Sequence, residues 1–252
     1  MPRHRRVLEM PAQTAIGYGP EMKLCVFGAS GPVGRAVVGQ ALDADHEVTA
    51  VTRQPERYDL SAPRLHVVGG DVLDPRAVEA AIRGADAVIT TVGVLPSRKP
   101  VNTYSAGTRN MVQAMRMQGT RRIVCVSSKE LDEEGTRDEP LLYRFAFARL
   151  LGLVNKNIYD DMTRMETILR ASDRDWTILR PAGLFAAARV SDYRCPTGHE
   201  PGVSTSIADL ANALLREAVE NLNVGRTLQV LTDDGKPPYL LLLARQSSLH
   251  RR

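Results

Sequence analysis

The chain has 252 residues, of which 43% are hydrophobic and 25% charged, and its formal net charge is +4. This length is enough for one well-packed core. The excess positive charge gathers in residues 3–6 and 245–252, so the near-balanced middle argues against a nucleic-acid-binding surface. No apolar run approaches the roughly 18 residues that a membrane helix needs, and no histidines or cysteines have the spacing of a metal site.

The two ends of the chain differ from its middle. Residues 1–21 are polar, contain several Pro and Gly, and lack the apolar centre of a signal peptide. We therefore expect a disordered extension and a cytoplasmic protein. A single folded domain is expected over 22–233, followed by a tail at 234–252. Three cysteines lie far apart in the sequence and are expected to be reduced: Cys25, Cys125 and Cys195.

Strand and helix patterns alternate regularly in the first half of the chain. Apolar runs rich in Val and Ile predict strands at 23–27, 47–51, 65–68, 87–92 and 122–126. Helical spacing of apolar residues predicts helices at 32–43, 75–83 and 103–118. Strands that are apolar on both faces and alternate with helices indicate a parallel sheet covered on each side. The predicted fold class is α/β, with a doubly wound parallel sheet and a ligand crevice beyond the carboxyl ends of the strands.

The alternation is less regular after residue 128. Charged residues at 129–140 predict a loop. Helices are then expected at 141–153, 156–171 and 207–220, and strands at 176–179 and 227–231. Ser206 directly precedes the last helix and is expected to be its N-cap.

A glycine-spaced turn joins the first strand to the first helix. The spacing is G-x-x-G-x-x-G, looser than the G-x-G-x-x-G of dehydrogenases, at Gly28, Gly31 and Gly34. Such a turn brings backbone N–H groups and the positive end of a helix dipole to one point, where phosphates bind. Pro32 has no N–H to donate. We therefore expect a phosphate cradle from the amides near Ser30, Val33 and Gly34, with the serine hydroxyl as a further donor. The alternative is a turn that only packs the helix on the strand.

The second strand ends in Val51-Thr52-Arg53, with Arg57 nearby and no carboxylate at the strand end. In dinucleotide-binding folds this position carries either an acid for a ribose 2′-hydroxyl or a cation for a 2′-phosphate. A guanidinium pairs with a phosphate bidentately, whereas an acid repels it. The sequence therefore favours NADP(H) over NAD(H). The alternative is that Arg53 is an ordinary exposed arginine.

Two further strand ends are expected to border the adenosine half of this cofactor. Asp71-Val72, at the end of the third strand, is expected beside the adenine, unless Asp71 only caps the next turn. Thr91-Val92-Gly93 ends the fourth strand, where a small residue lets the backbone approach the ribose.

Together these residues resemble the atypical short-chain dehydrogenase/reductases with an NAD(P)-binding Rossmann domain, including the NmrA-like proteins and the biliverdin reductase B/flavin reductase type. The likeness covers about 22–233 and is carried by Gly28–Gly34, Arg53, Gly70-Asp71-Val72, Val126-Ser127-Ser128 and Asp175–Pro181. It implies a Rossmann-type fold with a smaller substrate lobe built mainly from 182–206. By position it also implies that Ser127 lies at the cofactor and Ser128 at the nicotinamide, and that Arg180 and Pro181 close the substrate pocket.

The chain departs from this family at the usual catalytic pair. Typical reductases of the superfamily place a tyrosine four residues before a lysine, whose ammonium lowers the pKa of the phenol. None of the seven tyrosines in the chain has a lysine four residues later. The residue four positions after Tyr159 is Thr163, and Lys156 lies three positions before Tyr159. Ser128 and Tyr159 stay as candidate catalytic residues, with loop capping and packing as their alternative roles.

The expected function is an NADP(H)-binding oxidoreductase that transfers hydride to a small planar or carbonyl acceptor such as a flavin or quinone. Positioning the nicotinamide is most of that task. One alternative is a non-catalytic NADP(H)-sensing regulatory or assembly protein of the NmrA-like kind, with a protein partner. A weaker alternative is a sugar-nucleotide epimerase-like enzyme, which relies on the absent pair. No metal, nucleic acid or membrane is expected to bind, and a homo-oligomer stays open.

Overall fold

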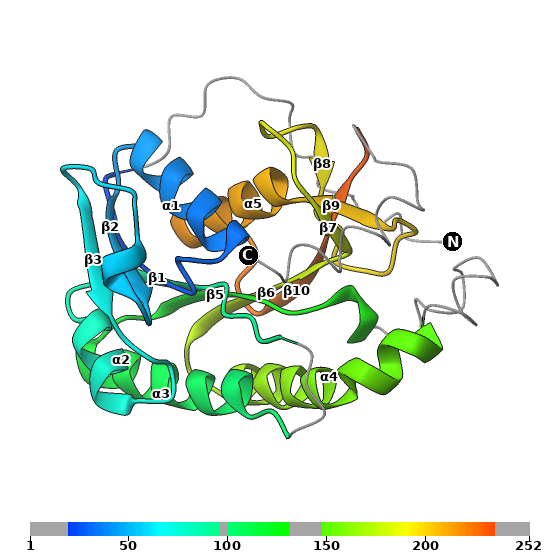
Figure 1. Cartoon of the computed structure of the whole chain (residues 1–252), viewed down its shortest axis with the longest axis horizontal. Coiled ribbons are helices and arrows are strands. Elements are labelled where there is room, and N and C mark those ends of the chain that lie inside the picture. The colour runs from blue at the N-terminus through cyan, green and yellow to red at the C-terminus, as the bar shows by residue number, and fades with distance from the viewer. Residues whose placement is uncertain (1–19, 96–99, 132–147, 235–252) are drawn as a thin grey trace, which may run out of the picture.

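One mixed sheet runs through the computed structural model, which describes residues 20–95, 100–131 and 148–234 (Figure 1). The strand pairings in this sheet are parallel, except that one edge strand, β8 (Tyr193–Arg194), is antiparallel to its neighbour. From edge to edge the strands are β3 (Leu65–Gly69), β2 (Glu47–Thr52), β1 (Lys23–Phe27), β4 (Ala87–Thr90), β5 (Arg122–Val126), β6 (Asp175–Pro181), β10 (Arg226–Thr232) and β8 (Tyr193–Arg194).

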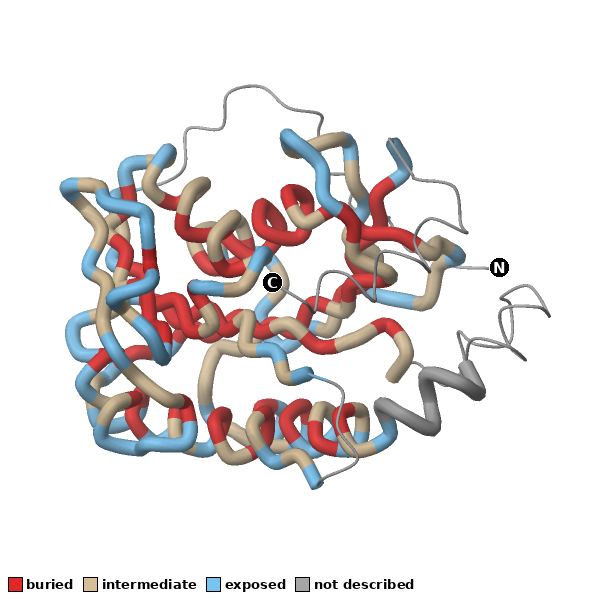
Figure 2. The backbone as a smooth tube through the Cα atoms, viewed as in Figure 1, coloured by how far each residue is buried: buried red, intermediate tan, exposed pale blue. Residues whose placement is uncertain are grey.

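Helices cover both faces of this sheet (Figure 1). One face packs against α1 (Pro32–Asp43) and α5 (Ile207–Glu220), and the other against α2 (Pro75–Ile82), α3 (Thr103–Gln118) and α4 (Ala148–Arg170). Each face has its own apolar cluster: Val37 and Leu214 belong to the first, and Met115 and Leu169 to the second. Figure 2 shows the buried positions concentrated in the strands and on the inward sides of the helices. The predicted doubly wound α/β fold is confirmed.

The order of the strands determines where a ligand can bind. The chain passes from β1 to β2 and β3 in one direction and then returns to place β4 on the other side of β1. In such sheets the crevice lies beyond the carboxyl ends of the strands at this reversal. Gly28 follows β1 and Thr91 follows β4, so the glycine turn lies at the reversal point.

Some predicted boundaries were wrong. Two helices were predicted at 141–153 and 156–171, but one helix, α4, runs without a break through the part of them that the structure describes. Neither Gly nor Pro occurs at 154–155, so the sequence has no residue there that ends a helix. The fourth strand ends at Thr90 rather than at residue 92. Most of the predicted loop 129–140 lies outside the described residues, apart from a short 3-10 turn, η2 (Lys129–Leu131).

Three short strands were not predicted. β7 (Gly183–Phe185) pairs in parallel with β9 (Ser204–Ser206), and β8 adds an antiparallel edge to β10. They all fall within the segment that the resemblance assigned to a substrate lobe, 182–206. The backbone N–H of Ala182 donates to Oγ1 of Thr205 at 2.9 Å, which ties this segment to the end of β6.

Two expectations about individual side chains are confirmed. Oγ of Ser206 accepts from the backbone N–H of Asp209 at 3.0 Å and so caps α5. The three cysteines are free thiols, and Cys25 and Cys125 are fully buried in the strands. Burial raises the pKa of both thiols, and it raises the pKa of Cys195 to about 12. The predicted extension, 1–21, and tail, 234–252, lie almost entirely outside the described residues.

Candidate functional site

The glycine turn presents unpaired backbone donors at the start of α1. Within the described residues, the N–H groups of Ser30, Val33 and Gly34 donate to no other atom. Gly31 is the N-cap of α1 and provides no side-chain cap, and no acid lies in the first turn. The positive end of the helix dipole is therefore uncompensated by a side chain. A cofactor pyrophosphate fits this donor set, because its oxygens would accept the three open N–H groups.

The glycines also bring the strand and the helix close together. Gly28 has a φ of +77°, a conformation that favours glycine, and a Cβ there would lie 2.8 Å from the backbone of Thr91. A Cβ on Gly34 would lie 2.2 Å from the carbonyl oxygen of Gly28. The tight-turn alternative therefore describes the packing correctly, and the N–H groups of Ser30, Val33 and Gly34 stay without a partner in this turn. Pro32 is exposed at the first position of the helix, as its missing N–H allows.

Arg53 lies just beyond the end of β2, next to the switch point. Its side chain is exposed and forms no hydrogen bond or ion pair within the described residues. Arg57, at the end of a short turn (η1, Pro55–Arg57), is oriented by a bond from its Nη1 to Oε1 of Gln54 at 3.0 Å. The guanidinium group of Arg53 is thus available to an anionic ligand at the adenosine end of the crevice.

Asp71 and Val72 lie beyond β3, which ends at Gly69, so they do not end the strand as predicted. Oδ1 of Asp71 accepts from the backbone N–H of Leu73 at 2.9 Å, which is the capping role given as its alternative. The side chain of Val72 is buried. It packs so closely on Gly107 of α3 that a Cβ at Gly107 would lie 3.0 Å from Cβ of Val72. Val72 is therefore part of the apolar core.

The end of β4 is fastened to the glycine turn. Oγ1 of Thr91 donates to the carbonyl oxygens of Phe27 at 3.1 Å and of Gly28 at 3.2 Å. Val92 packs partly buried against the core, whereas Gly93 is exposed and a Cβ there would have no atom within 4 Å. A ligand can therefore approach the backbone at Gly93.

A buried carboxylate that the sequence interpretation missed joins two of the predicted residues. Glu166 of α4 is 1% exposed. Its Oε1 accepts from Oγ of Ser127 at 2.6 Å and from Nε of Arg180 at 3.0 Å, while its Oε2 accepts from Arg180 at 2.8 Å and from Arg170 at 2.7 Å. No local pattern in the sequence indicated this contact, because Glu166 lies 39 positions after Ser127.

These bonds determine the charge on Glu166. Burial raises the pKa of its carboxyl, but the bonds from Arg180 and Ser127 and the nearby charges of Arg180 and Arg170 lower it more, and the net pKa is below its ordinary value. The carboxylate is therefore ionised and fully engaged. Ser127 and Arg180 direct their side chains to Glu166, and Pro181 is buried in β6 beside them.

The two candidate catalytic residues lie on different elements. Oγ of Ser128, after β5, donates to a carboxylate oxygen of Glu130. Tyr159 is half-buried on α4. Lys156 pairs its ammonium with Asp160, at 2.6 Å, so that charge is engaged by an acid of the same helix. Beside Ser128, Lys129 is buried and donates to the carbonyl oxygen of Gly202 at 2.5 Å, which connects the end of β5 to the segment 182–206.

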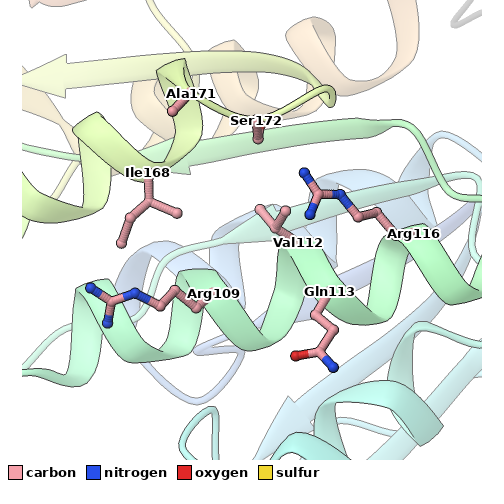
Figure 3. Close-up of a pocket in the computed structure, with 7 residues that line it drawn as sticks. All are labelled: Arg109, Val112, Gln113, Arg116, Ile168, Ala171 and Ser172. Carbon is pink, nitrogen blue, oxygen red and sulfur yellow. The ribbon is translucent and has the colours of Figure 1, made fainter.

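A hollow of about 290 Å³ lies between α3 and α4, away from the glycine turn (Figure 3). Figure 3 shows Arg109, Val112 and Arg116 of α3 on one side and Ile168 of α4 on the other. Helices run opposite to the strands they follow, so the carboxyl ends of α3 and α4 lie at the amino ends of the strands. Arg116 pairs with Asp173 at 2.9 Å. This hollow is not part of the cofactor crevice.

Among the described residues, no group of three or more His, Cys, Asp or Glu side chains is arranged to hold a metal ion. Within the same residues, no helix has the length and apolar character needed to cross a membrane.

Comparisons with known proteins agree with this geometry. Residues 28–221 match the model of a family described as NAD(P)H-binding. The matched range begins at the first glycine of the turn, directly after β1, and extends through α5. The resemblance inferred from the sequence is confirmed at the level of the family.

Three relatives illustrate the range of this similarity. A stretch of 108 residues is 37% identical to the uncharacterized protein Rv2047c of Mycobacterium tuberculosis, covering 42% of this chain but only 12% of that protein. The oxidoreductase aflX of Aspergillus parasiticus is 27% identical over 179 residues, 64% of this chain and 65% of its own. YhfK of Bacillus subtilis, described as an uncharacterized sugar epimerase, is 26% identical over 219 residues, 84% of this chain and 89% of its own.

A solved structure has the same fold. A short-chain dehydrogenase/reductase of Veillonella parvula, in complex with NADP, superposes with a TM-score of 0.71 at 19% identity, covering 86% of this chain and 99% of that one.

Proposed function

We propose that this chain, which belongs to the NAD(P)H-binding family, is an oxidoreductase that binds NADPH and transfers hydride to a small planar or carbonyl acceptor. The observation that carries the proposal is the open glycine turn. The unpaired N–H groups of Ser30, Val33 and Gly34 lie at the switch point of the sheet, where a pyrophosphate would accept their bonds.

Arg53 supports a preference for NADPH. Its guanidinium is exposed and unpaired within the described residues, directly after β2. A 2′-phosphate can take two parallel N–H bonds from such a group, whereas a 2′-hydroxyl gains little from it. The uncompensated charge of Arg53 therefore supports the phosphorylated cofactor.

On the acceptor side, bound NADPH would supply the hydride, and the protein would hold the acceptor beside the nicotinamide. Glu166 fixes the ends of β5 and β6, so that Ser128 is presented at the carboxyl end of the sheet. Tyr159 is not followed by a lysine four residues later, and Lys156 pairs with Asp160. Since the Tyr-x-x-x-Lys arrangement that activates a phenol is absent from the sequence, acceptors that need little protein acid, such as flavins and quinones, suit this site best.

Isothermal titration calorimetry tests the cofactor half of the proposal. We expect NADPH to bind more tightly than NADH, and Arg53→Ala to lose most of this preference. Arg109→Ala is the matched control, since this exposed arginine lies in the hollow between α3 and α4. Equal affinity for the two cofactors, or an unchanged preference in Arg53→Ala, would contradict the proposal.

Oxidation of NADPH in the presence of flavins, quinones and aldehydes tests the catalytic half. We expect turnover with a flavin or quinone, and a slower turnover in Ser128→Ala. Tight binding of NADPH without turnover of any acceptor would instead support a non-catalytic sensing or assembly protein. The similarity to YhfK favours sugar-nucleotide epimerisation as a second candidate, but the absent Tyr-x-x-x-Lys pair weighs against it.

We further propose a cytoplasmic location, which the three free thiols support. Cell fractionation with an antibody to the chain tests this location.

A further inference from the structure

A second arginine lies at the adenosine end of the candidate site, on the first turn of α1. Nε of Arg35 donates to the carbonyl oxygen of Ser30 at 3.3 Å, so its side chain follows the outer edge of the glycine turn. About 40% of this side chain is exposed. Arg35 thus places a guanidinium beside the phosphate cradle, on the side that faces the loop after β2.

The guanidinium of Arg35 is held by two residues of that loop. Its Nη1 lies 2.5 Å from Oδ1 of Asp59, and its central carbon lies 4.9 Å from the centre of the Tyr58 ring. Tyr58 is 9% exposed, and its hydroxyl has no hydrogen-bond partner within the described residues. The buried ring orients the guanidinium by a cation–π contact, while Asp59, with 81% of its side chain exposed, takes the outer donor.

The same loop carries the arginines already described. Arg53 begins it and Arg57 ends its 3-10 turn, and the guanidinium of Arg35 contacts the residues that follow this turn. A phosphate monoester carries up to two charges and three acceptor oxygens, and so attracts guanidinium groups more strongly than one carboxylate does. An exposed ion pair such as Arg35–Asp59 is weak enough for a phosphate to displace.

We propose that Asp59 occupies the place on Arg35 that the 2′-phosphate of NADPH takes on binding. Arg35 is then a second 2′-phosphate-binding arginine, and Asp59 is its competitor in the free protein. The inference rests on the proposed function, which assigns the same phosphate to Arg53. This exchange sharpens the selection between the two cofactors. NADH has no group that could displace Asp59, so the Arg35–Asp59 ion pair stays intact when NADH binds.

Calorimetry of the full chain with four ligands tests this exchange: NADPH, NADH, adenosine 2′,5′-bisphosphate and 5′-AMP. Asp59→Asn keeps the shape of the side chain and removes the competing charge. We expect it to tighten the binding of NADPH and of the bisphosphate about two- to fivefold at low salt, and to leave NADH and 5′-AMP unchanged. Arg35→Gln should weaken the two phosphorylated ligands. In the double variant, Asp59→Asn should have no further effect, because the group it competes for is gone.

Glu56→Gln is the matched control, since this exposed acid lies in the same loop and pairs with no cation within the described residues. Equal tightening by Glu56→Gln and Asp59→Asn would overturn the inference, because removal of any negative charge would then explain it. An effect of Asp59→Asn that persists without Arg35 would overturn it too. A wild-type protein without preference for NADPH contradicts the proposed function instead. A preference that is lost in Arg53→Ala but insensitive to Asp59→Asn overturns only the role of Asp59.

Discussion

Oγ of Ser127 donates to Oε1 of Glu166 across 2.6 Å, and this bond fastens the end of β5 to the middle of α4. The same carboxylate binds Arg180 at the end of β6. One buried side chain therefore fixes the ends of β5 and β6. Ser127 and Arg180, which the resemblance placed at the cofactor and the substrate, are positioned through Glu166.

Loss of the Glu166 charge should destabilise the fold strongly. In Glu166→Gln, the guanidinium of Arg180 loses its buried partner, and we expect the free energy of unfolding to fall by about 3–5 kcal/mol. Glu217→Gln is the matched control. Glu217 is 3% exposed and lies 3.4 Å from the buried Arg122, but that guanidinium also donates to Oγ1 of Thr177 and to two backbone carbonyl oxygens, so it keeps partners when the carboxylate is lost. Burial also raises the pKa of Glu217 above its ordinary value. Urea unfolding should show a much smaller loss for Glu217→Gln, and equal losses would contradict the role given to Glu166.

The same two variants should differ in their dependence on pH. The pKa of Glu166 is lower in the fold than in the unfolded chain, so its contribution is complete at neutral pH and is lost as the pH falls below about 4.3. The difference in stability between the wild type and Glu166→Gln should therefore shrink in acid. The pKa of Glu217 is raised, so its contribution is present below about 4.3 and is lost as the pH rises through its folded value. Unfolding measured from pH 3 to 7 would disprove this sign if both differences changed in the same direction.

Two glycines of α1 should respond oppositely to alanine. In Gly34→Ala, the new Cβ would meet the carbonyl oxygen of Gly28 at 2.2 Å, so we expect a loss of about 3 kcal/mol or more and greatly weakened NADPH binding. Gly39→Ala, five residues further along the same helix, meets no atom within 4 Å and should stabilise the helix by about 0.5–1 kcal/mol. Thermal unfolding and calorimetry check both variants. A well-folded Gly34→Ala protein with unchanged affinity would refute the close packing of the turn.

The elements that the sequence predicted are those that are specified locally. The apolar run of β1, the glycine turn and the start of α1 lie within thirteen residues, and Ser206 caps a helix that begins at the next residue. Each of these features depends on neighbours in the chain.

The features that were missed depend on residues far apart in the sequence. Ser127 and Glu166 are 39 positions apart, and nothing in either local pattern specifies the other. β7 and β9 have three residues each and exist because they pair with residues 21 positions away, which periodicity cannot reveal. The break predicted within α4 has a different cause, since positions 154–155 hold neither Gly nor Pro and nothing local ends the helix there.

The start of α3 is capped by a residue of α4, and this contact should be measurable. Asn102, the N-cap residue, makes no side-chain cap bond. Instead Oδ2 of the buried Asp161 accepts from the backbone N–H groups of Tyr104 at 2.8 Å and Ser105 at 3.3 Å. Asp161→Ala should therefore lower the stability by about 2 kcal/mol and speed hydrogen exchange at these two amides.

Loss of this cap should also reach the cofactor crevice. The hydroxyl of Tyr104 accepts from the backbone N–H of Val94 at 3.3 Å, and Val94 follows Gly93 in the segment after β4. We therefore expect weaker NADPH binding in Asp161→Ala, with the loss proportional to the increase in exchange at Tyr104. Asp160→Ala is the control, because this neighbouring acid is exposed and pairs only weakly with Lys156, and it should change the stability by no more than about 0.5 kcal/mol. If the two variants behaved alike, the carboxylate of Asp161 would not be the cap of α3.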